Sequence, residues 1–160
     1  MSRRPLAAFA ALTLALAGCG GSGDDGDAYV RDWTTACRNL QVTERQLRVD
    51  VARAGAEGGS GSAARRIRRI RPAFQRYVAT TSSTLRALRA VDAPDRWADY
   101  DRRADAVLGS LDQRLRQAGQ ALAAGDLAAI ERLAGAVRSS PVPDAPEDLA
   151  RRLPACRGVL

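Results

Sequence analysis

Apolar side chains recur at intervals of three and four residues between Trp97 and Leu122, and this spacing constrains the fold more than any other feature of the chain. Such a period places the side chains on one face of an α-helix, whereas a half-buried β-strand would alternate at every second residue. The positions are Trp97, Tyr100, Ala104, Val107, Leu111, Leu115, Ala118 and Leu122. No run of residues alternates with period two, so we expect an all-α fold.

The same spacing predicts helices on either side of this segment. We expect helices over residues 27–54, 63–91 and 127–138, a third helix with Pro94 in its first turn that ends near residue 124, and a short C-terminal helix. Their connections are short, and short connections join antiparallel neighbours in helical bundles. The sequence therefore predicts an antiparallel up-down-up-down four-helix bundle with a short C-terminal helix.

Three local signals refine these helices. Pro72 lies inside the second pattern, so that helix either bends there or restarts with proline in its first turn. Gly125 is placed to end the third helix, because glycine commonly follows the last helical residue. Asp144 and Glu147 have the spacing of a capping box at the start of the last helix.

The first 18 residues have the three parts of a secretory signal. Arg3 and Arg4 give a positive start, and an uncharged apolar run extends from Leu6 to Ala17. This run of 12 residues is well short of the about 20 that a membrane-spanning helix requires. Ser2-Arg3-Arg4 also matches the start of a twin-arginine signal, although two arginines fit an ordinary signal equally well.

The sequence Leu16-Ala17-Gly18-Cys19 resembles a bacterial lipobox. The resemblance implies cleavage after Gly18 and a lipid on Cys19, with acyl chains such as palmitate that hold the protein on the outer side of the cell membrane. The alternative is cleavage by an ordinary signal peptidase, which leaves Cys19 unmodified. We expect residues 1–18 to be removed, residues 19–26 to form a flexible tether, and residues 27–160 to form one helical domain.

Two further cysteines, Cys37 and Cys156, remain in a chain that we expect to enter an oxidising compartment. Such pairs usually form disulfides. The bundle topology supports the pairing, because the last segment returns toward the first helix and brings Cys156 near Cys37. The alternative is a pair of buried free thiols.

The chain contains neither lysine nor histidine, and this excludes many kinds of catalytic site. A Ser-His-Asp triad and a Cys-His pair both need histidine, and a phosphate-binding P-loop needs lysine. Histidine-ligated zinc, di-iron and haem sites are excluded as well. We therefore expect a non-catalytic protein without a metal or cofactor.

Several segments together resemble the small helical lipoproteins of high-GC Gram-positive (actinobacterial-type) bacteria. The segments are the lipobox, the pair Trp33 and Cys37, the run from Leu88 to Asp95, the sequence Ala-Ala-Gly-Asp at 123–126 and Leu-Pro-Ala-Cys at 153–156. This resemblance implies a helical protein of the cell envelope and carries no known activity with it.

Five arginines at the start of the second predicted helix form the densest cluster of charge in the chain. They are Arg65, Arg66, Arg68, Arg69 and Arg71. The cluster is a candidate anion-binding patch for a phosphate-bearing polymer or another envelope component. The alternative is an ordinary solvated helix face. Nucleic acid is excluded as a partner by the predicted location and by the lack of interleaved aromatic residues.

Three other groups of residues are weaker candidates. Asp99, Asp101 and Asp105 could hold a divalent cation, but the neighbouring arginines favour a salt-bridged helix face. Glu44 and four aromatic residues could surround a site for a small ligand or metal between the helices. The aromatic residues are Trp33, Tyr77, Trp97 and Tyr100, and their spacing favours ordinary core packing. A carrier of a small ligand or metal is therefore the alternative function.

Overall fold

A computed structural model describes residues 24–56, 63–126 and 142–158, together with positions 128, 131, 132 and 135. Throughout these residues the chain is helical or irregular and contains no strand, which confirms the predicted all-α class. The elements in chain order are α1 (Asp24–Ala56), α2 (Ala63–Leu88), the 3-10 helix η1 (Asp95–Trp97), α3 (Ala98–Ala124), α5 (Glu147–Arg152) and the 3-10 helix η2 (Pro154–Cys156).

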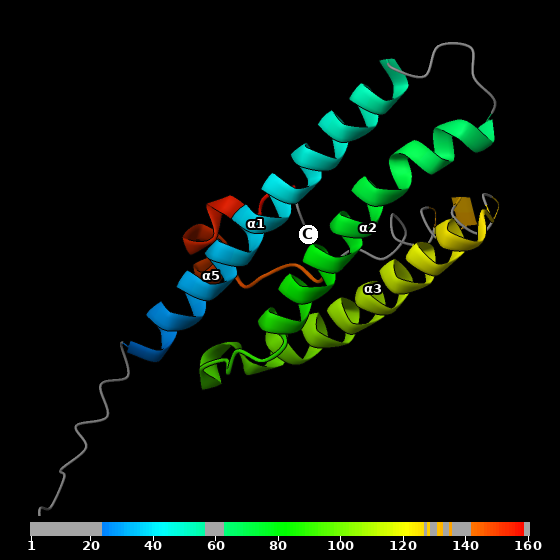
Figure 1. Cartoon of the computed structure of the whole chain (residues 1–160). Helices are drawn as coiled ribbons and strands as arrows, with labels where there is room; N and C mark the ends of the chain where they lie inside the picture. The colour runs from blue at the N-terminus through cyan, green and yellow to red at the C-terminus, as the bar shows by residue number, and fades with distance from the viewer. Residues whose placement is uncertain are drawn as a thin grey trace, which may run out of the picture.

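The three long helices lie side by side, with α2 between α1 and α3, and consecutive helices run in opposite directions (Figure 1). The short elements α5 and η2 lie beside the first half of α1 (Figure 1). Within the expected fourth helix, residues 127–138, the structure describes only four positions, and all four are helical. The complete four-helix arrangement thus remains a prediction.

The ends of α1 and α2 differ from the expected helix boundaries. Helix α1 begins at Asp24, so residues 24–26 belong to the helix and not to the tether. Helix α2 ends at Leu88 rather than at residue 91, and it continues through Pro72 with its first turns inclined to the rest (Figure 1). This bend is expected, because proline removes one backbone hydrogen bond and its ring crowds the preceding turn.

The ends of the later helices confirm one of the expected local signals, Gly125, and contradict another, the capping box. Gly125 adopts a positive φ of 78° and ends α3, as the sequence predicts. The expected capping box is wrong: α5 begins after Pro146, and this N-cap residue makes no side-chain capping hydrogen bond. Pro94 similarly precedes η1 without a side-chain cap, and this 3-10 turn separates Pro94 from α3. A proline therefore occupies the N-cap position before each of these two helices.

Aromatic rings form the centre of the core at the end of the domain where α1 begins. Trp33 contacts Tyr29 and Tyr100 at ring-centroid distances of 5.8 and 5.7 Å, and Tyr29 contacts Trp97 at 5.5 Å. Leucines from α2, α3 and the C-terminal segment belong to the same cluster as the rings: Leu85, Leu88, Leu108, Leu149 and Leu153. The short α5 segment therefore belongs to the core and is not an appended tail.

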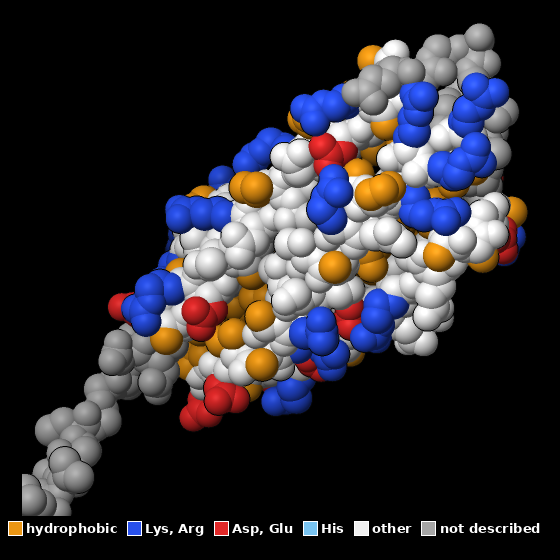
Figure 2. Space-filling model, in the orientation of Figure 1, with side chains coloured by type: hydrophobic (Ala, Val, Ile, Leu, Met, Phe, Trp, Pro, Cys, Tyr) orange, Lys and Arg blue, Asp and Glu red, His pale blue; other side chains and the backbone are white. Residues whose placement is uncertain are grey.

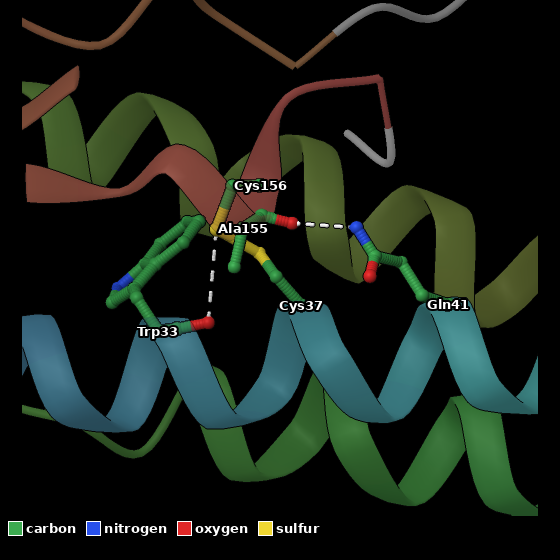
Figure 3. Close-up of a disulfide and its surroundings, with 5 residues drawn as sticks. All are labelled: Trp33, Cys37, Gln41, Ala155 and Cys156. Atoms are coloured by element: carbon green, nitrogen blue, oxygen red, sulfur yellow. Dashed lines mark hydrogen bonds between the residues drawn. A yellow bond between two sulfur atoms is a disulfide. The ribbon is translucent and has the colours of Figure 1, made fainter. Parts of the chain in front are cut away.

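The disulfide between Cys37 and Cys156 closes the domain, as the sequence predicts (Figure 3). It joins α1 to η2 across 119 residues of sequence. One turn away, the Gln41 amide donates a hydrogen bond of 2.8 Å to the Ala155 carbonyl (Figure 3). Among the described helices, none is long and apolar enough to span a membrane.

Candidate functional site: an arginine patch at the far end of the helices

Basic side chains gather at the end of the molecule where α1 finishes and α2 starts (Figure 2). Helix α2 contains seven arginines and no acidic residue. The side chains of Arg65, Arg68 and Arg69 are exposed, and Arg71 is partly buried. The Arg66 side chain lies outside the described part of the structure. We call Arg65, Arg66, Arg68, Arg69 and Arg71 the arginine patch.

The exposed arginines of this patch have no acidic partner within the described part of the chain. Arg65, Arg68 and Arg69 form no ion pair there, in contrast to Arg76, which lies farther along α2 and binds Asp50 of α1. Because unpaired guanidinium groups keep all their hydrogen-bond donors for a ligand, the patch is suited to bind carboxylate or phosphate groups.

A groove of about 380 Å³ runs between the end of α1 and the start of α2, directly beside the patch. Helix α1 contributes Asp50, Arg53 and Ala54 to this groove. Helix α2 contributes Arg69, Pro72, Ala73 and Arg76. Arg53 was not among the expected patch residues, because it lies on α1 and the cluster lies on α2. The short connection between the two antiparallel helices is the signal that could have found it.

Asp50 is the one acidic residue among the described residues that line this groove. Its carboxylate accepts hydrogen bonds of 2.9 Å from both Arg76 Nη2 and Gln46 Nε2. Only 12% of its side chain is exposed. The hydrogen bond from Arg76 is the main cause that lowers the pKa of Asp50, and the bond from Gln46 adds to it. Asp50 is therefore a charged carboxylate that already occupies part of the basic groove.

The aspartates considered for a cation site have separate partners. Asp99 binds Arg102, Asp105 binds Arg89, and Asp101 accepts a hydrogen bond of 2.8 Å from the Tyr29 hydroxyl. Among the described residues, no group of three or more Asp, Glu, Cys or His side chains is arranged to hold a metal ion.

Glu44 and the aromatic residues do not come together around one site. Glu44 binds Arg48 at the surface, with nearly half of its side chain exposed. Tyr77 packs against Phe74, with ring centroids 6.0 Å apart, and belongs to a different ring cluster from Trp33. Burial raises the pKa of Tyr100 to about 12, so its hydroxyl stays protonated at physiological pH.

A pocket of about 230 Å³ does lie beside Trp33 and Tyr100, beneath the segment Val142–Ala145 and next to Leu153. It is smaller than the 300–1,000 Å³ that is usual for small-molecule sites. Trp33 and Tyr100 are 1% and 4% exposed, so little of either ring is open to a ligand.

Comparison of the chain with protein-family models, with curated proteins and with solved structures found no match. The expected lipid attachment at Cys19 and the expected signal at residues 1–18 lie outside the described residues. The features that bear on function are therefore the signals in the sequence and the arginine patch with its groove.

Proposed function

We propose that this chain is a non-catalytic, lipid-anchored protein on the outer side of a bacterial cell membrane, where it binds an anionic component of the envelope. The observation that carries the binding part is the set of exposed arginines at the start of α2, which have no acidic partner in the described residues. The lipobox-like sequence ending at Cys19 supports the anchored part.

The disulfide supports the proposed location. Disulfides form and persist in oxidising compartments and are rare in the cytosol of ordinary bacteria. Because Cys37 and Cys156 are bonded in the fold, the domain suits export. We further propose that residues 127–138 form a fourth helix that completes an up-down-up-down bundle.

The position of the patch favours a partner away from the anchor. Helix α1 has 33 residues and is thus about 50 Å long. It begins next to the proposed tether and ends at the basic groove (Figure 1). A domain that stands upright on its tether therefore presents the patch to a polymer or protein of the envelope, and not to its own membrane.

Binding to isolated cell envelopes tests this proposal. The described core residues all lie between Tyr29 and Cys156, so a chain of residues 24–160 retains the whole described core. We expect this domain to bind envelopes at low salt and to dissociate at high salt. Replacement of all five patch arginines by glutamine should abolish that binding.

A matched control removes the same amount of charge elsewhere. Five exposed arginines outside the patch and the groove, replaced by glutamine, form this control: Arg31, Arg38, Arg45, Arg103 and Arg157. If the control loses as much binding as the patch variant, net charge and not the patch governs binding. If wild type does not bind envelopes at all, the proposal that the protein binds an anionic component of the envelope is wrong.

A carrier of a small ligand is the second candidate, and the pocket of about 230 Å³ beside Trp33 and Tyr100 limits it to compounds smaller than the usual ligands of such sites. A ligand there should change the fluorescence of the neighbouring tryptophan. A screen of small apolar compounds that leaves the fluorescence and the melting temperature unchanged would exclude this candidate.

A further inference from the structure

We propose that the groove between α1 and α2 binds a linear polyanion and that Asp50 acts as a built-in counter-ion that weakens this binding. The binding of a linear polyanion rests on the proposed function, because it specifies the class of anion that the arginine patch binds. The second part of the proposal assigns a role to a residue outside the patch.

The arrangement of the arginines favours a chain of charges over a single anion. Arg65, Arg69 and Arg76 are separated by four and seven residues, which places them on one face of α2. From the first to the last they cover about 16 Å of helix axis. Arg53 faces this row from α1 across the groove. A free phosphate could meet only part of this row, whereas a linear polyanion could meet all of it.

Asp50 lies where such a ligand must bind. It lines the same groove as Arg53 and Arg69, and it already uses the guanidinium group of Arg76. An incoming phosphate group must therefore displace Asp50 from Arg76 or remain close to a second negative charge. Both cost binding free energy, since like charges that are close together repel. Removal of the carboxylate should strengthen binding.

Glu44 provides a matched control for Asp50. Both residues are on α1, and both form an ion pair with an arginine. Glu44, however, does not line the basic groove, and its partner Arg48 is three-quarters exposed. Asp50→Asn and Glu44→Gln change the net charge by the same amount, so the comparison separates the effect of net charge from that of a carboxylate in the groove.

The experiment measures binding of inorganic polyphosphate to residues 24–160 over a range of salt concentrations. We expect Asp50→Asn to raise the affinity about fivefold, the effect of one unit charge about 4 Å away in water. Glu44→Gln should change it by less than about twofold. The double variant Arg53→Gln/Arg69→Gln should reduce the slope of log affinity against log salt by about one for each arginine. Melting curves of each variant check that the fold is retained.

Three results would overturn the proposal. Equal effects of Asp50→Asn and Glu44→Gln would show that only net charge matters. Competition by inorganic phosphate at the same phosphate concentration would show that the groove binds single anions. Tighter binding to anionic lipid vesicles than to polyphosphate, with the same pattern among the variants, would assign the groove to a membrane surface.

This test is independent of the envelope experiment. If the domain binds envelopes but Asp50→Asn behaves like Glu44→Gln, the proposed function stands and the role of Asp50 is wrong. If Asp50→Asn strengthens binding to polyphosphate but wild type ignores envelopes, the groove is a polyanion site whose natural partner lies elsewhere.

Discussion

At the scale of single residues, Asp112 is the least expected feature of the fold. Its spacing from Arg116 suggests a surface ion pair, yet the residue is only 2% exposed. One carboxylate oxygen lies 3.1 Å from Arg116 Nη1, and the other is buried without a hydrogen-bond partner in the described structure. Burial of a charged group with an unused hydrogen-bond acceptor costs free energy, so Asp112 lowers the stability of the fold.

The two members of this pair should respond differently to substitution. Asp112→Asn removes the buried charge and should change the free energy of unfolding by less than about 1 kcal/mol. Arg116→Gln removes the arginine that contacts the buried carboxylate and should cost about 1–2 kcal/mol, a reduced value because Arg116 is more than half exposed. Urea denaturation measures both.

Arg151→Gln serves as the control for this prediction, since its pair with Glu147 is exposed on both sides. It should change stability by less than about 0.5 kcal/mol. A larger loss of stability in Asp112→Asn than in Arg116→Gln would show that the buried carboxylate is not what lowers the stability of the fold.

Asp112 and Tyr29 also show why residues are harder to predict than helices. Periodicity gives the direction of a helix face, but the width of the buried face depends on how many neighbours cover the helix. Tyr29 is fully buried because Trp33, Trp97 and the hydroxyl-binding Asp101 surround it. Trp97 and Asp101 come from a segment far along the chain, and no pattern within α1 contains them.

At the scale of helices, a glycine inside α3 and the glycine that ends it should respond in opposite ways to the same substitution. A Cβ on Gly119 would lie 3.5 Å from Val78 Cγ1, an ordinary contact, and alanine favours the helix interior. A Cβ on Gly125 would meet nothing, but its φ of +78° disfavours any side chain. Gly119→Ala should therefore stabilise by about 0.5–1 kcal/mol, and Gly125→Ala should destabilise by about 1 kcal/mol.

Thermal unfolding of the two variants checks this prediction, with wild type as the common reference. A lower melting temperature for Gly119→Ala would mean that α2 and α3 pack more closely at Val78 than ordinary contact allows. An unchanged melting temperature for Gly125→Ala would mean that the end of α3 adjusts to a different cap.

The sequence predicts the helices better than their ends. Three long helices are recovered because their apolar spacing persists over many turns. The ends depend on single residues, and several residue types can serve the same purpose there. Asp144 and Glu147 have the right spacing for a capping box, but Pro146 starts α5 without one. The arginine cluster was recognisable from sequence, whereas Arg53 and Asp50 join it only through the pairing of α1 with α2.

At the scale of the whole molecule, the C-terminal segment is tied to α1 by several kinds of contact. Leu149 and Leu153 are buried in the core, Trp97 donates a hydrogen bond of 2.9 Å to Asp148, and Asp27 binds Arg152. The disulfide between Cys37 and Cys156 adds a covalent link to these contacts. The segment therefore closes the domain at the end that carries the aromatic core.

The disulfide should decide whether the domain is stably folded. A bond that closes a loop of 119 residues lowers the entropy of the unfolded chain and should stabilise by up to about 4–5 kcal/mol. Domains of this size have a total stability of about 5–15 kcal/mol. Urea denaturation should therefore show a large loss of stability in Cys37→Ser/Cys156→Ser and an equal loss in reduced wild type. Reductant should not affect the double variant. Equal midpoints for oxidised and reduced wild type would show that the non-covalent contacts of the C-terminal segment hold the domain closed without the disulfide.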